Sequence, residues 1–256
     1  AVSITAAFKG SAGITIGNIV GSNILNVSII LGLASVIIPI AVQKSTVKYE
    51  MPFMMAVTLL LVLLGMDGKI SRLDGAILWA CFLLYLYYIY RMTKNGKEEQ
   101  AADAMPLAKS ILFVLLGAVG VVLGSDFAVD GASELARIFG MSERFIGLTI
   151  VAMGTSLPEL VTTVTAILKK ESSLSVGNII GANMIDSAFI LPICTLLSGE
   201  KLPVSLQMAQ IDMPLCILIS VLALLPMLIR QKIKRRDGIL VFSIYAGYLL
   251  YICWAI

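Results

Sequence analysis

Eight runs of apolar residues, each about 20 residues long, follow one another along this chain. A helix needs about 20 consecutive apolar residues to cross a bilayer, so each run predicts a transmembrane helix. The mean hydropathy is +0.96 and only 14% of the residues are charged, against about a quarter in soluble domains. We therefore expect an all-α polytopic membrane protein with about eight transmembrane helices after a short helix stub. The expected spans are 12–40, 48–66, 74–91, 107–125, 144–168, 174–198, 208–229 and 238–256.

The residue types exclude several classes of function. The chain has no histidine, which removes a common ligand of haem and zinc and the commonest general base. Its four cysteines lie inside apolar runs without CxxC spacing, which is typical of buried thiols. An intramembrane hydrolase would need a nucleophile with a base, or paired aspartates. The net charge of +3 is spread without a basic, aromatic-rich cluster. We expect no enzyme, no cofactor and no nucleic-acid partner.

The longest polar stretch lies near the middle of the chain, at residues 94–106. It is expected to be a linker between residues 1–93, which hold the remainder of a first repeat, and residues 107–256, which hold a second. If this linker is cytoplasmic, alternate loops place 13 of the 19 Lys and Arg residues inside and six outside. Basic residues favour the cytoplasmic side, so the bias predicts this orientation in the cell membrane.

A segment near the N-terminus recurs in the second half of the chain. With an offset of 160 residues, 1–31 aligns with 161–191 without a gap, and "VGNIIGANMIDSAF" is a near-copy of "IGNIVGSNILNVSI". The identical positions of the first copy are Thr5, Ala6, Lys9, Gly17, Asn18, Ile19, Gly21, Asn23, Ile30 and Leu31. The copies lie an odd number of crossings apart, so they run in opposite directions. Such inverted repeats, here 1–40 and 144–198, are typical of secondary transporters, which bind substrates where the repeats meet.

The stretch "GTSLPEL" at residues 154–160 interrupts an apolar run with polar residues. Pro158 has no backbone N–H and breaks the helix. Such a break is tolerated at membrane depth only inside protein or beside a water-filled cavity. Thr155, Ser156 and Glu159 fall within about one turn, at spacings that share a helix face. An isolated carboxylate in a membrane segment indicates function.

Polar residues also recur four positions apart in the spans that carry the repeated motif. Ser22 and Asn26 occupy these positions in the first copy, and Ala182 and Asp186 in the second. Carboxylate, amide, hydroxyl and freed backbone oxygens are hard ligands, which suit Ca²⁺ and Na⁺ rather than soft metals. We therefore predict a cation site. Its candidate ligands are Glu159, Asp186, Asn26, Ser156, Thr155 and Ser22.

The other polar and small residues of the repeats have simpler interpretations. Amides often bond across membrane helices, and glycines spaced as GxxxG allow helices to pack closely. These roles are expected of Asn18, Asn23, Asn178 and Asn183 and of Gly17, Gly21, Gly177 and Gly181. Glu50 and Asp212 each stand two residues before a proline and are expected to cap the N-termini of helices.

The paired motifs resemble a known family. "GTSLPEL" followed about twenty residues later by "GN-x-x-G-x-N-x-x-D", with a first copy "GN-x-x-G-S-N-x-x-N", resembles the repeats of the Ca²⁺/cation antiporter superfamily. The resemblance is closest to its prokaryotic Na⁺/Ca²⁺ exchanger branch, and the approach "GSDFAVDGASELARIFGMSERFIGLTIVAMGTSLPEL" is similar to that branch too. It covers essentially the whole chain and implies a ten-helix transporter.

The resemblance also implies roles for the candidate ligands. By position, Glu159 would be a principal Ca²⁺ ligand, and Asp186 and Asn26 would be the matching ligands on the partner helices. Thr155 and Ser156 would contribute oxygens that Na⁺ also uses.

One position departs from the family pattern. Ser22 would supply a hydroxyl at a Na⁺ site, but its counterpart is Ala182, where the family often has Ser. The departure removes one hydroxyl ligand and bears on the Na⁺ stoichiometry or affinity.

The function that the resemblance implies is the exchange of Na⁺ for Ca²⁺ across a membrane by alternating access. Both ions would bind as substrates. A Ca²⁺/H⁺ antiporter, dependence on K⁺ and a non-transporting membrane subunit remain alternatives. The resemblance also leads us to expect an N-terminally truncated chain, because the first "GTSLPE" equivalent would end just before Ala1. Exchange is therefore expected of the full-length parent protein, and this fragment alone is expected to be inactive.

Overall fold

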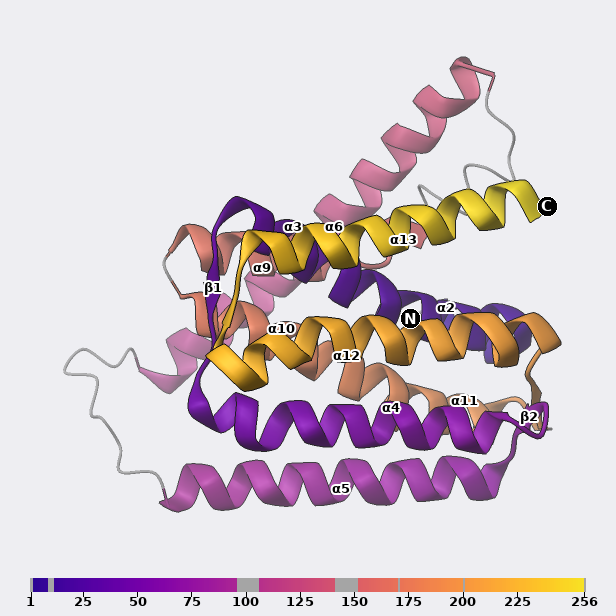
Figure 1. Ribbon diagram of the computed structural model, residues 1–256, viewed down its shortest axis with the longest axis horizontal. Helices are drawn as coiled ribbons and strands as arrows, with labels where there is room; N and C mark the ends of the chain where they lie inside the picture. The colour runs from indigo at the N-terminus through magenta and orange to yellow at the C-terminus, as the bar shows by residue number, and fades with distance from the viewer. Residues whose placement is uncertain are drawn as a thin grey trace.

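The computed structural model describes residues 2–8, 12–95, 106–140, 152–169, 171–199 and 201–255. Within these residues the chain is almost entirely helical. Several of the long helices, among them α4, α5, α12 and α13, run roughly parallel to one another, whereas α6 slants away from them (Figure 1). The predicted all-α architecture is confirmed.

The first half of the chain builds a short helix and then three long helical segments among the described residues. The segment formed by α2, η1 and α3 is continuous, because the residues at its junctions keep right-handed helical backbone angles. The elements in order are α1 (Val2–Phe8), α2 (Ala12–Leu25), η1 (Asn26–Leu31), α3 (Gly32–Ile37), β1 (Ile40–Ala41), η2 (Thr46–Glu50), α4 (Met51–Gly65), β2 (Lys69–Ile70) and α5 (Arg72–Asn95). Here η marks a π-helical turn.

The second half adds the long helix α6 and then follows the same plan. Its elements in order are α6 (Leu107–Ile138), α8 (Ala152–Gly154), α9 (Leu157–Leu168), α10 (Ser172–Ile185), η4 (Asp186–Ile190), α11 (Leu191–Leu197), β3 (Leu202–Pro203), η5 (Met208–Asp212), α12 (Met213–Arg230), β4 (Lys232–Ile233) and α13 (Arg235–Ala255).

Five helical segments have the length and composition of a membrane span in the described part of the chain. They are Thr15–Ile37, Thr46–Gly65, Arg72–Met92, Leu174–Leu197 and Met208–Arg230. Shorter apolar helices cover Ala108–Gly124 and Leu157–Leu168, and α13 is 21 residues long. Each predicted span therefore coincides mostly with helix where it is described, apart from residues at the ends of spans, such as 38–40 in the first, and the turn at 155–156 in the fifth. Residues 96–105 of the expected linker and 144–151 of the fifth span lie outside the described residues.

The two halves repeat one another element by element. The order α2, η1, α3, β1, η2, α4, β2, α5 in the first half is matched by α10, η4, α11, β3, η5, α12, β4, α13 in the second. The short strands pair across the halves, β1 with β4 and β2 with β3, both antiparallel. Because β1 corresponds to β3 and β2 to β4, exchanging the halves turns one pairing into the other. This reciprocity is what inverted repeats related by a pseudo-two-fold axis require.

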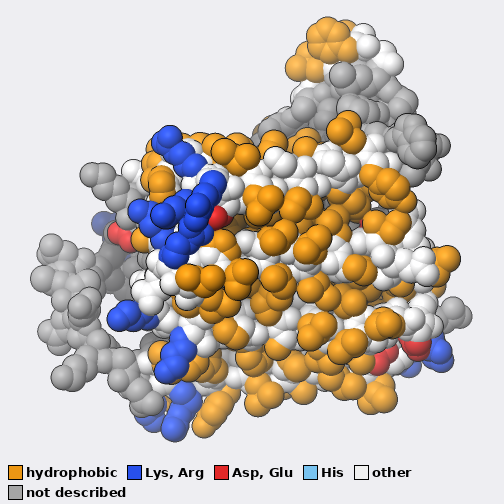
Figure 2. Space-filling model, viewed as in Figure 1, with side chains coloured by type: hydrophobic (Ala, Val, Ile, Leu, Met, Phe, Trp, Pro, Cys, Tyr) orange, Lys and Arg blue, Asp and Glu red, His pale blue; other side chains and the backbone are white. Residues whose placement is uncertain are grey.

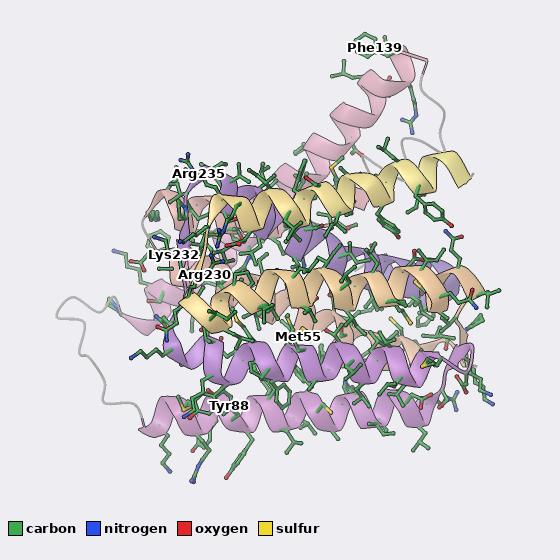
Figure 3. The ribbon with its side chains drawn as sticks, in the orientation of Figure 1. Met55, Tyr88, Phe139, Arg230, Lys232 and Arg235 are labelled. Carbon is green, nitrogen blue, oxygen red and sulfur yellow. The ribbon has the colours of Figure 1, made fainter. Side chains whose placement is uncertain are left out.

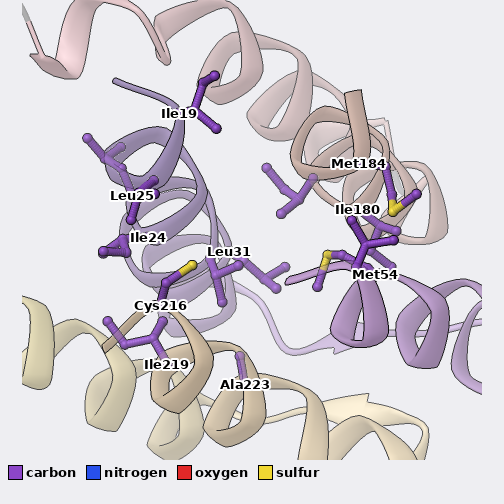
Figure 4. Packing of buried hydrophobic residues seen from close by; sticks show 14 of the residues in the cluster. Ile19, Ile24, Leu25, Leu31, Met54, Ile180, Met184, Cys216, Ile219 and Ala223 are labelled. Carbon is purple, nitrogen blue, oxygen red and sulfur yellow. The ribbon is translucent and has the colours of Figure 1, made fainter. Parts of the chain in front are cut away.

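The core surrounds the continuous segment α2–η1–α3. Its span is 72% buried, whereas the span in α5 is 17% buried. Ile19, Ile24 and Leu31 from this segment belong to one apolar cluster with Met54 of α4 and Cys216 of α12 (Figure 4). Apolar side chains also spread over the outside of the molecule (Figure 2), as expected where lipid is the solvent.

Two helix crossings depend on glycine. Gly75 of α5 lies against Thr195 of α11, and Gly238 of α13 lies against Ser35 and the backbone carbonyl of Gly32 in α3. A Cβ at either position would overlap these neighbours. Gly75 and Gly238 are 163 residues apart and occupy equivalent places in the two repeats.

The glycines of the GxxxG pairs do not pack in this way, so that prediction is wrong. Around Gly21, Gly177 and Gly181, no atom of another described element lies within 4 Å of the place a Cβ would take. Gly17 meets only the end of Met208, at 3.7 Å. Within the described part of the chain, these glycines lie on helix faces without a close neighbour, and the tight crossings use Gly75 and Gly238.

Candidate functional site

The predicted helix break is present between α8 and α9. α8 ends at Gly154 and α9 begins at Leu157, so Thr155 and Ser156 form the turn between them. The backbone N–H of Ser156 donates to Met153 O at 3.1 Å, which keeps the turn tight. Pro158 stands in the first turn of α9, where its missing N–H costs little.

Glu159 occupies the first turn of α9, where the helix dipole favours a negative charge. Its Oε2 atom is buried and has no hydrogen-bond partner among the described residues. The backbone around it is held firmly, since Thr162 Oγ1 donates to Pro158 O at 2.9 Å and Asn178 Nδ2 donates to Thr162 Oγ1 at 2.8 Å. The turn is therefore fixed, while this carboxylate oxygen makes no hydrogen bond within the described part of the chain.

Asn26 and Asp186 begin the π-helical turns η1 and η4. Asn26 is 1% exposed, and its Nδ2 donates to Asn183 Oδ1 at 3.0 Å. Its Oδ1 is buried without a partner among the described residues. π-helical turns occur frequently at functional sites, and here each one begins with a predicted ligand.

The repeat asparagines join the helices, as the sequence analysis expected. Asn23 Nδ2 donates to Ser187 Oγ at 2.6 Å, and Asn183 Nδ2 donates to Asn23 O at 3.4 Å. Each bond runs between the two repeats. Asn18 Nδ2 donates to Ser3 Oγ at 2.8 Å and ties α2 to α1. These amides hold the candidate ligands at the centre.

The elements that carry the predicted ligands converge. η1 contacts both α9 and α10, and α2 contacts both α8 and η4. The carboxylate of Asp186 lies within electrostatic reach of Glu159. The described residues contain no cluster of three or more His, Cys, Asp and Glu side chains that could hold a metal, so the charge at this centre comes from two carboxylates and the remaining candidate ligands are neutral.

The candidate ligands that carry a hydroxyl group are buried or half-buried. Ser156 is 2% exposed, and Thr155 beside it is half-buried. Ser22 is half-buried one helical turn before Asn26, and Ala182 takes the same place before Asp186. The geometry brings the strongest support to Glu159 and Asn26, which each have a buried oxygen without a partner among the described residues, and to Asp186, which interacts electrostatically with Glu159.

A cavity of about 580 Å³ reaches this centre from the side. One wall is apolar and comes from α6, including Val114 and Val121, while the other includes Glu159, Thr162 and Asn178. Glu159 is the one candidate ligand among the described residues that line this cavity.

Sequence reasoning missed two polar residues that shape the site. Ser187 accepts the hydrogen bond from Asn23, and Thr162 links α9 to α10. Ser187 replaces Val27 of the first copy. The sequence signal that could have identified Ser187 is a polar residue at a position that is apolar in the other copy of the repeat.

Comparison with known proteins identifies the family. A model of the sodium/calcium exchanger protein family matches residues 1–91 and 109–254. The inner membrane protein YrbG of Escherichia coli is 32% identical, over 99% of this chain and 81% of its own length. The sodium/calcium exchanger MaX1 of Methanosarcina acetivorans is 27% identical, over 98% of this chain and 83% of its own length.

A solved structure agrees with these matches. The sodium-calcium exchanger NCX_Mj, soaked with Na⁺ and Sr²⁺, has a TM-score of 0.82 to this chain at 32% identity, over 97% of this chain and 80% of that one. Its likeness extends over the inverted repeats and the broken helix described above. This chain is a multi-pass membrane transporter, not an enzyme, and it belongs to the sodium/calcium exchanger family.

Proposed function

We propose that this protein exchanges Na⁺ for Ca²⁺ across the cell membrane by alternating access. Membership of the exchanger family supports the proposal, as do the names of MaX1 and NCX_Mj, both sodium/calcium exchangers. Both ions would be substrates of one site at the junction of the repeats.

The observation that carries the proposal is a set of three buried acceptor oxygens without partners. Glu159 Oε2, Asn26 Oδ1 and Asn23 Oδ1 are in this state among the described residues, and Asp186 lies within electrostatic reach of Glu159. Burying an unpaired acceptor costs about 1–3 kcal/mol, which a bound cation would recover. Two carboxylates also balance the charge of one Ca²⁺, and the hard oxygens suit it.

Exchange would follow from competition for these oxygens. Ca²⁺ would use the carboxylates of Glu159 and Asp186, and Na⁺ would use a subset of the same groups with hydroxyls of Ser156, Thr155 and Ser22. Two nearby carboxylates in a medium of low dielectric constant repel each other strongly when the site is empty. An empty site would therefore resist the change of access, and each crossing would require a bound ion.

Ca²⁺ uptake into proteoliposomes tests the coupling ion. With purified protein and an outward Na⁺ gradient, we expect ⁴⁵Ca²⁺ uptake at least about tenfold above uptake without a gradient, because opposing fluxes share one site. An outward proton gradient of similar size should give no such increase. Uptake driven by protons and not by Na⁺ would contradict Na⁺ coupling and would favour a Ca²⁺/H⁺ antiporter. Added K⁺ should leave the Na⁺-driven rate unchanged.

The substitution Ala182→Ser tests the asymmetry of the repeats. It would give the second repeat the hydroxyl that Ser22 provides in the first. One added ligand of this kind is worth about 1 kcal/mol, so the Na⁺ concentration that half-maximally drives Ca²⁺ uptake should fall about fivefold. The converse change, Ser22→Ala, should raise it. An unchanged Na⁺ dependence in both variants would exclude these two positions from the Na⁺ sites.

A further inference from the structure

The turn between α12 and α13 is unusually basic. Five of the seven residues from 230 to 236 are Lys or Arg, in the order Arg-Gln-Lys-Ile-Lys-Arg-Arg. Figure 2 shows most of the visible basic side chains at one end of the molecule and a smaller group at the other, and Figure 3 places Arg230, Lys232 and Arg235 together at the first of these ends. The turn begins at Arg230, the last residue of a helix with the length and composition of a membrane span, and the end of such a span meets the headgroup region of a bilayer.

The one acid beside this turn is already engaged. Asp237 Oδ2 accepts from Arg230 Nη2 at 2.7 Å and from the backbone N–H of Lys234 at 2.8 Å, and its side chain is only 10% exposed. These bonds close the turn. The side chains of Lys232, Lys234, Arg235 and Arg236 remain exposed, so most of the positive charge faces outward.

The equivalent turn of the first repeat shows that the fold does not need this charge. It reads Asp-Gly-Lys-Ile-Ser-Arg-Leu-Asp from Asp67 to Asp74, and Asp74 Oδ2 accepts from the backbone N–H of Ser71 at 2.7 Å, as Asp237 does from Lys234. Two basic and two acidic residues give this turn no net charge, whereas residues 230–237 carry five basic residues and one acid, a net charge of +4. The two turns share a shape and differ in charge.

Two more lysines extend the positive surface. Strand β1 pairs with β4, with Ala41 opposite Lys232, and Val42 N–H donates to Gln231 O at 3.0 Å. Lys44 and Lys48 follow β1 directly and are both exposed. We name the six exposed residues the basic patch: Lys44, Lys48, Lys232, Lys234, Arg235 and Arg236.

Exposed apolar side chains border the basic patch. Ile229 is 72% exposed just before it, and Ile239 and Leu240 are 53% and 49% exposed just after it. A soluble polyanion would leave these side chains in water. A phospholipid offers a phosphate to the basic residues and acyl chains to the apolar ones, so a lipid satisfies both surfaces.

We propose that the basic patch binds the headgroups of anionic phospholipids and holds this end of the transporter against the charged leaflet. Exposed Lys and Arg beside a membrane helix attract anionic lipid, and each strengthens the association about fivefold. Their contribution to orienting the chain is a separate effect, exerted during insertion. The proposal does not depend on the transported ion.

Lipid selectivity of the purified protein tests the proposal. The protein would be equilibrated in detergent micelles containing equal amounts of phosphatidylglycerol and phosphatidylcholine, and the lipids that stay bound would be counted by native mass spectrometry. We expect a preference for phosphatidylglycerol that falls at high salt. In the double variant Lys234→Ser, Arg236→Leu, each residue is replaced by its counterpart in the first-repeat turn, Ser71 or Leu73. The preference of this variant for phosphatidylglycerol should be about tenfold or more weaker than that of the unmodified protein.

A matched control removes two basic residues from the opposite end, Lys69→Ser and Lys201→Ser, and should keep the preference. Melting in phosphatidylcholine micelles checks that each variant folds. If the first double variant does not fold, Lys44→Gln with Lys232→Gln removes the same charge from exposed positions. A phosphatidylglycerol preference equal to that of the unmodified protein in the patch variant, or an equal loss in the control, would overturn the proposal.

Discussion

Replacing Glu159 with Gln is expected to abolish Ca²⁺ uptake while leaving the fold intact. Gln keeps the shape of the side chain but removes one of two negative charges at the centre of the repeats. Removing one partner from a buried charge interaction costs about 3–5 kcal/mol, so Ca²⁺ affinity should fall at least about 100-fold. The measurement is Na⁺-driven ⁴⁵Ca²⁺ uptake in proteoliposomes, together with Ca²⁺ binding by titration calorimetry.

The substitution Glu134→Gln is a matched control for this prediction. Glu134 lies on α6 with its side chain 70% exposed, 3.7 Å from Arg137, and such surface pairs contribute little. Its uptake should stay within about twofold of the unmodified protein. Gel filtration and thermal melting would establish that both variants fold. Normal uptake by Glu159→Gln would remove Glu159 from the site.

The inverted repeat was predictable from sequence because its inner helices are constrained. Positions such as Asn23 and Asn183 form hydrogen bonds between the repeats, so few substitutions are tolerated and the copies still align at an offset of 160 residues. The outer helices α5 and α13 are counterparts as well, and at an offset of 163 residues 72–92 and 235–255 share identical residues that include Arg72, Asp74, Gly75 and Tyr85. This part of the repeat does not appear in an ungapped alignment at 160, because the connections between the helices differ in length in the two halves.

The predicted roles that failed depend on contacts between distant residues. Asp212 was expected to cap a helix, but it lies where η5 continues into α12 and makes no side-chain cap bond. Its Oδ1 instead accepts from Tyr248 Oη at 2.7 Å. Glu50 likewise makes no cap bond. A proline predicts a helix start locally, but no local pattern shows that the preceding turn is already helical or that a tyrosine on α13 lies beside it.

Contacts between distant residues also decide which glycines matter for the stability of the protein. Gly238→Ala should destabilise the protein strongly, because its Cβ would overlap Ser35 and the backbone carbonyl of Gly32. A backbone atom cannot rotate away as a side chain can, so α13 and α3 must separate. Overpacking of this kind costs about 1–3 kcal/mol, and we expect the upper end of that range, seen as a lower midpoint of thermal unfolding in detergent.

Substitutions at two further glycines test whether close helix packing causes the loss of stability. Gly247 lies on the same helix with no described atom of another element within 4 Å of the place a Cβ would take, so Gly247→Ala should cost nothing. Gly75→Ala at the equivalent crossing should also destabilise the protein, but less than Gly238→Ala, because its Cβ would overlap the side chain of Thr195, which can rotate, while the nearest backbone atom, Pro192 Cα, lies at 3.3 Å. If Gly247→Ala were as harmful as Gly238→Ala, the loss would come from the helix itself. If only the two crossing glycines matter, one packing constraint has been kept in both repeats.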